Sequence, residues 1–263
     1  MKIENSVVWI VGGTSGIGEG IAELLVSKGA KVVISGRNMV NGEKIAERLG
    51  DNCCFYKADV TVVEELQAAA QAVVDKWGRM DAAVNTAAVN YFHDIFDENG
   101  ELVNDDAFRK HIEVNVIGAY DFARIAAYHI KKNEPNPEEY GERGSIILTS
   151  SLAAFSTGGA HQYAYKTSKT ALAGLMRALA VNLAPFGIRV NMLAPGFIKT
   201  PMTLDPISNP FFDLTKDVDI PSQLFPIKVG LPIHCAKTVV HLLENVFINK
   251  LEILVDGGSK NRL

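Results

Sequence analysis

Cysteine, an excess of charge of one sign and long apolar runs are all scarce in this sequence. Three of its 263 residues are cysteines, and because Cys53 and Cys54 are adjacent while Cys235 is remote, they suit neither a disulfide framework nor a zinc site. No uncharged apolar run reaches the roughly 18 residues of a membrane-spanning helix, and no export signal precedes the strand-like residues that begin at Ser6. We therefore expect a cytoplasmic protein with no membrane partner.

Charge and histidine content argue against two further classes of ligand. Lysine and arginine number 26 against 30 aspartates and glutamates, for a net charge of -4, and the basic residues are scattered. Because a nucleic-acid-binding surface concentrates positive charge, nucleic acid is not an expected partner. The six histidines lack the spacing of paired metal ligands, so we expect no metal site. We predict that they lie on the surface or in loops, with His161 near a substrate.

Two periods alternate along the chain. Strand-length apolar runs occupy 7–11, 31–35, 53–57, 82–85, 145–149, 189–193 and 251–255, and helical patterns lie between them, clearest at 18–28, 62–77, 105–131, 165–183 and 233–245. Near-continuous apolar strands separated by helices are typical of a parallel sheet covered on both faces. With 48% apolar residues and no shift in composition, the sequence predicts a single doubly wound α/β domain over residues 1–263 with seven strands.

Two segments break this alternation and are predicted to be loops. Residues 133–143 are acidic with two prolines, and residues 200–232 carry five prolines before Pro232. With Phe211, Phe212 and Phe225, the second segment is the expected flexible lid over an apolar substrate. The alternative is a mobile loop that merely caps the core.

A glycine-rich turn follows the first predicted strand. The run GGTSGIG places Gly12, Gly16 and Gly18 where the chain turns from a strand into a helix. Glycine permits positive φ there and lets backbone N–H groups approach a diphosphate at the positive end of the helix dipole. The turn predicts a dinucleotide site; the alternative is that glycine only serves a tight connection between strand and helix.

The end of the second predicted strand bears on which dinucleotide is bound. Gly36 and Arg37 stand where an Asp or Glu would hold the 2′-hydroxyl of an NAD ribose. Gly36 leaves room, and Arg37 offers a fork of donors that suits a 2′-phosphate. NADP(H) is therefore favoured over NAD(H), the alternative being that Arg37 is a solvated loop residue of a site that accepts both.

Tyr165 and Lys169 lie four residues apart in YKTSK, and Ser150 and Ser151 close the apolar run before them. At this spacing two helix residues share one face, with Cβ atoms about 5–6 Å apart. A free phenol titrates near ~10, and an ammonium about 4 Å away in an effective dielectric of about 20 favours the phenolate by roughly 4 kcal/mol. We expect Lys169 to lower the pKa of Tyr165 so that the phenol works near neutral pH; the alternative is an ordinary pair of helix-surface residues.

Over essentially its whole length the sequence resembles the short-chain dehydrogenase/reductase family. GGTSGIG, Asp59-Val60, VNTAAV, Asn115, Ser151, YKTSK and PGFIKT follow one another in the family's order and spacing. Within the family, SSLAAF, HQYAYKTSK and NLAPFGIRVNMLAPGFIKTPM are most similar to the 3-hydroxyacyl-CoA dehydrogenase group that also oxidises hydroxysteroids. The resemblance implies a Rossmann-type fold, a tetramer, and NAD(P)-dependent interconversion of a secondary alcohol and a ketone.

The resemblance also implies a role for each matched catalytic residue. Tyr165 would exchange a proton with the substrate oxygen, Lys169 would lower its pKa and hold the nicotinamide ribose, and Ser151 would hydrogen-bond the substrate oxygen. Ser150 is the poorer choice because its side chain would point to the other face of the strand. Asn115 would anchor a water of a proton relay, or it would bond its own backbone and bend the helix.

The cofactor contacts implied by the resemblance run from the glycine turn to the sixth strand. They are Gly12, Thr14, Ser15, Gly16, Ile17 and Gly18 in the turn, Arg37 after the second strand, Asp59 and Val60 at the adenine, Asn85 and Ala87 at the ribose, Tyr165 and Lys169 at the nicotinamide ribose, and Pro195, Gly196, Ile198 and Thr200 at the carboxamide end. Two departures put cofactor affinity in doubt. Val11 replaces a Thr whose hydroxyl would link two strands, and Ala88 replaces a Gly close to the nucleotide.

These features together predict an NAD(P)-dependent oxidoreductase for a small-molecule secondary alcohol or ketone. A 3-hydroxyacyl-CoA-type thioester is the favoured substrate by resemblance, and a homo-tetramer is the expected assembly. Two alternatives stay open. One is a catalytically weak subunit of a heteromeric dehydrogenase, suggested by Val11 and Ala88, and the other is a non-enzymatic nucleotide-binding scaffold on the same fold.

Overall fold

Seven parallel strands form one sheet in the order β3-β2-β1-β4-β5-β6-β7. The structure is a computed structural model, and it describes residues 1–104, 106–156, 161–205, 224 and 229–259. The strands are β1 (Val7–Val11), β2 (Lys31–Gly36), β3 (Cys53–Lys57), β4 (Ala82–Asn85), β5 (Gly144–Thr149), β6 (Ile188–Pro195) and β7 (Glu252–Val255). The order reverses between β1 and β4, so a crevice is expected at the carboxyl ends of these two strands.

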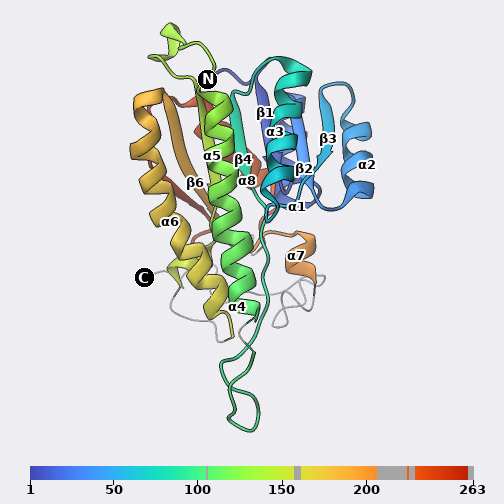
Figure 1. Cartoon of the computed structure of the whole chain (residues 1–263), viewed down its shortest axis with the longest axis vertical. Coiled ribbons are helices and arrows are strands. Elements are labelled where there is room, and N and C mark those ends of the chain that lie inside the picture. The colour runs from blue at the N-terminus through green and yellow to red at the C-terminus, as the bar shows by residue number, and fades with distance from the viewer. Residues whose placement is uncertain (105, 157–160, 206–223, 225–228, 260–263) are drawn as a thin grey trace.

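Helices cover both faces of the sheet (Figure 1). They are α1 (Gly16–Ser27), α2 (Met39–Leu49), α3 (Val63–Trp77), α4 (Asp106–His111), α5 (Gly118–Ile130), α6 (Tyr163–Leu183), α7 (Pro201–Leu204) and α8 (Pro232–Glu244). α3, α5 and α6 pack on one face, while α1, α2 and α8 pack on the other. The predicted doubly wound α/β sheet of seven strands is confirmed.

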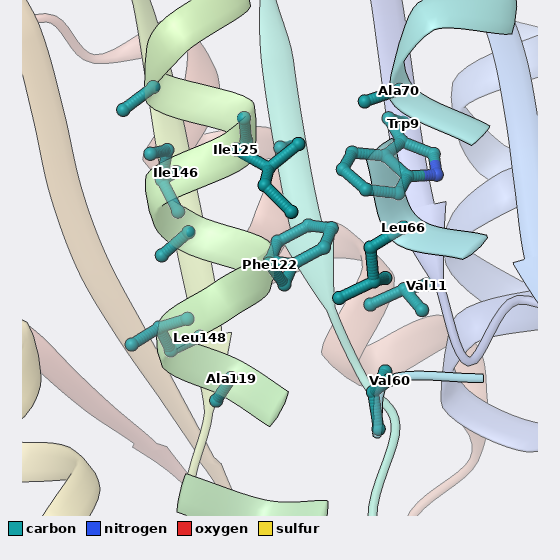
Figure 2. Close-up of a cluster of buried hydrophobic side chains, with 14 of the residues drawn as sticks. Trp9, Val11, Val60, Leu66, Ala70, Ala119, Phe122, Ile125, Ile146 and Leu148 are labelled. Carbon is teal, nitrogen blue, oxygen red and sulfur yellow. The ribbon is translucent and has the colours of Figure 1, made fainter. Parts of the chain in front are cut away.

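Strand β1, which contains Trp9, shows why the central strands are continuous apolar runs in the sequence. On β1, Val7, Trp9 and Val11 face α3 and α5, whereas Val8 and Ile10 face α1 and α8. Figure 2 shows the first of these layers, in which the rings of Trp9 and Phe122 approach with centroids 4.6 Å apart. Because both faces are buried, apolar residues are required at every position of the strand rather than at alternate ones.

One local prediction needs correction, and two further features were not predicted. The expected helix 105–131 is not uniform, because a π-helical segment, Ile112–Ile117, separates α4 from α5. The sequence patterns missed α2, whose start is capped by the Asn38 side chain accepting from the Asn41 amide at 3.0 Å. β7 lies at the sheet edge and is only half-buried, unlike the other apolar runs near the centre.

The two predicted loops have different outcomes. Residues 133–143 form a loop with one short 3-10 helix, Pro137–Glu139. Most of the predicted lid, including Phe211, Phe212 and Phe225, lies outside the described residues. Its two ends are described, and there Ile198 and Gly230 form an isolated parallel bridge. The bridge is reinforced by the Gly230 amide, which donates to the Phe197 carbonyl at 2.8 Å.

Candidate active site

A cavity of about 270 Å³ opens at the carboxyl ends of β1, β4, β5 and β6. Its wall contains most of the residues predicted as cofactor contacts: Gly12, Thr14, Ser15, Gly16, Ile17, Gly18, Arg37, Asp59, Val60, Ala87, Tyr165, Lys169, Pro195, Gly196, Ile198 and Thr200. Ser151 lines the same cavity. Residues from seven separate stretches of the chain therefore meet at the switch point of the sheet, as the fold class requires.

The glycine turn forms one end of this cavity. A Cβ on Gly18 would lie 2.3 Å from the Gly12 carbonyl oxygen, and a Cβ on Gly12 would lie 2.5 Å from the Ala87 amide nitrogen. Gly12 and Gly16 also adopt positive φ, at +77° and +57°. Ser15 precedes the first turn of α1 without making a side-chain cap, so the backbone at the start of α1 faces the cavity. A turn stripped of side chains at a helix N-terminus fits the diphosphate of a dinucleotide.

Charged side chains gather where β2 and β3 end. Arg37 is exposed and lines the cavity, together with Asp59 and Lys110. Burial tends to raise the pKa of Asp59, but hydrogen bonds from the Thr61 amide and hydroxyl, at 2.9 and 2.8 Å, outweigh it and lower that pKa. The positive charges of Arg37 and Lys110 act in the same direction. Asp59 is therefore ionised at neutral pH and is an acidic neighbour of Arg37.

Tyr165, Ser151 and Lys169 meet at the other end, where β5 finishes and α6 begins. Lys169 is 2% exposed, and its ammonium donates to the Thr149 carbonyl at 2.9 Å. The Lys169 nitrogen lies 5.7 Å from the centre of the Tyr165 ring, and the Tyr165 phenol hydrogen-bonds to Ser151. Ser150 points away and donates to the Lys169 carbonyl at 3.0 Å. The choice of Ser151 over Ser150 agrees with this geometry.

The pKa of Tyr165 moves in the direction opposite to the one expected from the sequence. Burial raises the pKa of the phenol, and the hydrogen bond with Ser151 only partly opposes that effect. Burial also lowers the pKa of Lys169 to about 7, so roughly half of the Lys169 side chains are protonated at neutral pH. The estimate from helical spacing was wrong because it counted the attraction between two charges and left out the cost of burying each of them.

Two predicted site residues do not line the cavity. Asn85 is buried, and its side-chain oxygen accepts from the Ala87 amide at 2.9 Å, so Asn85 shapes the wall from behind. Asn115 holds Val89 from both sides, accepting from its amide at 2.9 Å and donating to its carbonyl at 3.0 Å. The same amide group donates to the Ser168 hydroxyl at 3.0 Å. Asn115 therefore joins three segments rather than bonding its own backbone.

Thr86 compensates for the hydroxyl group that is missing at Val11. Its hydroxyl and its amide both donate to the Val11 carbonyl, at 3.0 and 2.9 Å. The hydroxyl that Val11 lacks on β1 is thus supplied from the end of β4, and the link between the strands is kept. Ala88 lines the cavity, as expected for a methyl group near a nucleotide.

Sequence reasoning missed several lining residues. Lys110, Val114, Met202 and Thr203 all face the cavity, and no short motif marks them. It also misplaced two histidines, because His111 is fully buried and His129 is 6% exposed rather than on the surface. The Nδ1 atom of His161 hydrogen-bonds to Asp94, and the His161 backbone carbonyl accepts from the His93 amide at 3.0 Å. Among the described residues no cluster of three metal-ligating side chains occurs.

Comparison with known proteins agrees with this geometry. The family described as enoyl-(acyl carrier protein) reductase matches residues 11–260. The human protein 3-hydroxyacyl-CoA dehydrogenase type-2 is 36% identical over 260 residues, which cover 98% of this chain and 97% of that protein. The chain belongs to the short-chain dehydrogenase/reductase family. Short-chain dehydrogenases/reductases are oxidoreductases that act on CH–OH groups with NAD(P), and interconversion of a secondary alcohol and a ketone is the reaction of this chain.

Solved structures of short-chain dehydrogenases/reductases support the same assignment. The 3-hydroxyacyl-CoA dehydrogenase type-2 of Mycobacterium avium superposes with a TM-score of 0.88 at 30% identity, covering 99% of this chain and 98% of that one. A 3-ketoacyl-(acyl-carrier-protein) reductase of Brucella melitensis complexed with NADH superposes with a TM-score of 0.81 at 28% identity, covering 98% and 99%. In the described part of the chain, no helix combines the length and apolar character needed to cross a membrane.

Proposed function

We propose that this chain is an NADP(H)-preferring dehydrogenase/reductase whose substrate is a 3-hydroxyacyl-CoA-type thioester or its 3-oxo counterpart. The observation that carries the proposal is the meeting of Tyr165, Ser151 and Lys169 in one cavity with a glycine turn shaped for a diphosphate. The nicotinamide, when bound, supplies or accepts the hydride. The chain itself holds the substrate oxygen and moves the proton.

Tyr165 is the proposed proton donor and acceptor for the substrate oxygen. Because burial raises its pKa, the phenol is neutral at physiological pH, which is the form that donates a proton to a ketone oxygen. The site as described is therefore ready for reduction, and oxidation requires the phenol to lose its proton first. Ser151, already bonded to the phenol, is placed to share the hydrogen bond to the same oxygen.

Lys169 is proposed to hold the nicotinamide ribose and to ease deprotonation of Tyr165. Its single hydrogen bond among the described residues goes to the Thr149 carbonyl, so a buried ammonium has donors left for a ribose hydroxyl. With a pKa of about 7, it gains or loses charge near physiological pH. Asn115 keeps Val89 and Ser168 in place beside this group and is the proposed anchor of the proton relay.

NADP(H) is proposed over NAD(H) on the strength of Arg37. Its guanidinium is exposed at the cavity rim, and a Cβ on Gly36 would meet the Thr14 hydroxyl at 2.8 Å, so position 36 has no room for an acidic side chain. Arg37, Thr14 and Ser15 are the residues that would hold a 2′-phosphate there. NAD(H) is the alternative cofactor, since the Brucella melitensis relative was crystallised with NADH.

The substrate class is carried over from relatives. Two of them are named for 3-hydroxyacyl-CoA and a third for a 3-ketoacyl carrier-protein thioester, and all three match nearly the full chain. We also propose a homo-tetramer in the cytoplasm. The outer faces of α5 and α6 support an assembly, because Tyr120 and Tyr128 on α5 and Val181 on α6 are exposed, as is Phe186 in the 3-10 turn after α6.

Fluorescence titration with NADPH and NADH, followed by a turnover assay on 3-oxoacyl-CoA thioesters and simple ketones, tests the proposal. Tighter binding of NADPH and turnover of a thioester are the expected results. Absence of binding by either dinucleotide would contradict the enzyme and the nucleotide-binding scaffold alike. Binding without turnover would leave the catalytically weak subunit or the scaffold.

A further inference from the structure

His111 is a buried imidazole beside the proposed active site that the mechanism above does not use. It is the last residue of α4, directly before the π-helical segment, and is fully buried. Its Nδ1 lies 2.7 Å from the Ala107 carbonyl oxygen, and its Nε2 lies 3.1 Å from the Tyr91 amide nitrogen. Because a carbonyl can only accept and an amide can only donate, Nδ1 carries the proton and Nε2 accepts. Both contacts are satisfied only in the neutral ring.

His111 hydrogen-bonds to the backbone of Tyr91, and Asn115, one helical turn later, hydrogen-bonds to the backbone of Val89. Each side chain ties the backbone of the β4–α4 loop (residues 86–104) to the helix that contains the π segment. Val89 lines the cavity, so the two ties fix the path of this wall at two points two residues apart. Removing either contact frees a stretch of backbone that has no strand or helix to hold it.

The imidazole also contacts the proposed catalytic tyrosine. The edge of the His111 ring meets the Tyr165 ring, with centroids 6.2 Å apart and planes at 68°. On its other side His111 stacks with His93, at 5.9 Å and 21°, and His93 in turn contacts Tyr163 at 4.8 Å. Tyr165 is thus held between Ser151, which bonds its hydroxyl, and His111, which limits the position of its ring.

We propose that neutral His111 is a positioning residue for Tyr165. Its ring sets the position of the tyrosine ring, and its hydrogen bond to Tyr91 sets the path of the loop that carries Val89 in the cavity wall. This inference rests on the proposed function, because it presumes that Tyr165 transfers the proton. It assigns a role to a side chain that does not line the cavity, and it predicts that acid pH impairs the site by protonating this ring.

The acid sensitivity follows from the groups that face His111. Burial lowers the pKa of His111, the hydrogen bond to Ala107 opposes this, and charge on His93 or Lys169 lowers it further. The facing groups are Tyr91 and His93 from the loop and Tyr165 and Lys169 from α6. When the ring takes up a second proton, Nε2 becomes a donor directed at the Tyr91 amide, which is itself a donor, and the tie to the loop is lost.

Two substitutions distinguish the contribution of the His111 ring from that of its hydrogen bonds. His111→Phe keeps an aromatic side chain but has no acceptor for Tyr91, and His111→Gln keeps one donor and one acceptor and does not protonate. His111→Phe is expected to lower kcat on the order of tenfold, since a displacement of about 1 Å can cost up to about a hundredfold. His111→Gln keeps the tie to Tyr91 but loses the ring contact with Tyr165, so it should lower kcat less than His111→Phe does. Dinucleotide affinity, measured by NADPH fluorescence, should be unchanged in both.

His129→Gln is the matched control, because His129 is also a buried histidine with a lowered pKa but lies on α5 away from the cavity. It should retain native turnover. The ratio of native to His111→Gln turnover should fall as the pH drops below 6.5, the ordinary imidazole value, and stay constant above it. A native kcat in His111→Phe, or a ratio independent of pH, overturns the proposal.

A readout that needs no turnover keeps this test distinct from that of the proposed function. In protein labelled with ¹³C at tyrosine Cζ, the Tyr165 signal is assigned by its loss in Tyr165→Phe. His111→Phe should shift or broaden that signal, and His129→Gln should not. If the native protein turns over no substrate, the proposed function fails, while an unmoved Tyr165 signal in His111→Phe rejects the positioning role whether or not the protein is active.

Discussion

The two ends of the cavity are built from different materials. The end proposed to hold the dinucleotide (the dinucleotide end) is built around the glycine turn, whose close contacts, such as that of Gly18 with Gly12, leave no room for a side chain. The proposed proton-transfer end contains half-buried Tyr165 and buried Lys169, and buried His111 packs against Tyr165; each is held by hydrogen bonds or ring contacts. The first end should be sensitive to added volume and indifferent to pH, and the second should be the reverse.

Removing the phenol is the most severe way to break the proton-transfer end alone. Tyr165→Phe is expected to lower turnover by about 10²–10⁴-fold, the usual contribution of a positioned acid or base, because no other group takes its place. NADPH affinity should stay within about twofold, since the glycine turn is untouched. Tyr128→Phe, on the exposed face of α5, is the control and should behave as the native protein. Residual turnover near the native rate would contradict the role of Tyr165.

Adding one methyl group should break the dinucleotide end alone. In Gly18→Ala the new Cβ would lie 2.3 Å from the Gly12 carbonyl, so the turn must shift, and NADPH affinity should fall tenfold or more. Gly174→Ala on α6 is the matched control, because its Cβ meets nothing within 4 Å. That control should bind NADPH normally and gain up to about 1 kcal/mol in unfolding free energy. Equal affinity in the two variants would show that the turn does not hold the diphosphate.

Reversing the charge at Arg37 tests whether this residue decides the preference between NADPH and NADH. Arg37→Asp should lower the ratio of NADPH to NADH affinity by about tenfold, since it removes a charge-assisted bond and adds repulsion beside Asp59. Arg37→Lys keeps the charge but loses the fork and should have a smaller effect. The two titrations are done by fluorescence at one salt concentration. A ratio that stays the same in Arg37→Asp means that the guanidinium does not read the phosphate.

The pH dependence of stability tests the proton-transfer end without any ligand. The pKa of Lys169 is about 7 in the folded chain against 10.5 ordinarily, so between these values the unfolded chain binds more protons and unfolding free energy rises with pH. From pH 7 to pH 9 this group contributes an increase of about 2 kcal/mol. Below pH 7 the destabilisation is complete and constant.

Lys169→Met removes that titration. Urea unfolding at pH 7 and pH 9 should therefore show a smaller rise in the variant than in the native protein, by about 2 kcal/mol. Groups common to both proteins cancel in the difference. Identical rises would mean that Lys169 is solvated like an ordinary lysine.

The fold and the glycine turn that lines the cavity could be predicted because their signals are local. Strand-length apolar runs define the sheet, and the glycines of one turn follow one another in the sequence. The neighbours of Tyr165 could not be predicted in the same way. His111 reaches Tyr91 across 20 residues and Asn115 reaches Val89 across 26, so neither contact leaves a short motif.

Burial accounts for the other predictions that were wrong, namely the direction of the Tyr165 pKa and the placement of two histidines on the surface. The spacing of Tyr165 and Lys169 predicts that they are neighbours, which is correct, but it carries no information about the cost of burying them, which decides the direction of the Tyr165 pKa. His111 and His129 were placed on the surface for the same reason. Thr86 shows a related limit, since a missing hydroxyl at Val11 is replaced from a different strand.

The bridge between Ile198 and Gly230 has a practical consequence for altering this protein. It fixes the exit and the return of the intervening segment at one place beside the cavity, so the sheet does not depend on how long that segment is. Closing a loop twice as long costs only about 0.6 kcal/mol more. Lengthening the chain between the two bridge residues is therefore expected to leave the sheet intact, and a longer variant should unfold at nearly the same urea concentration.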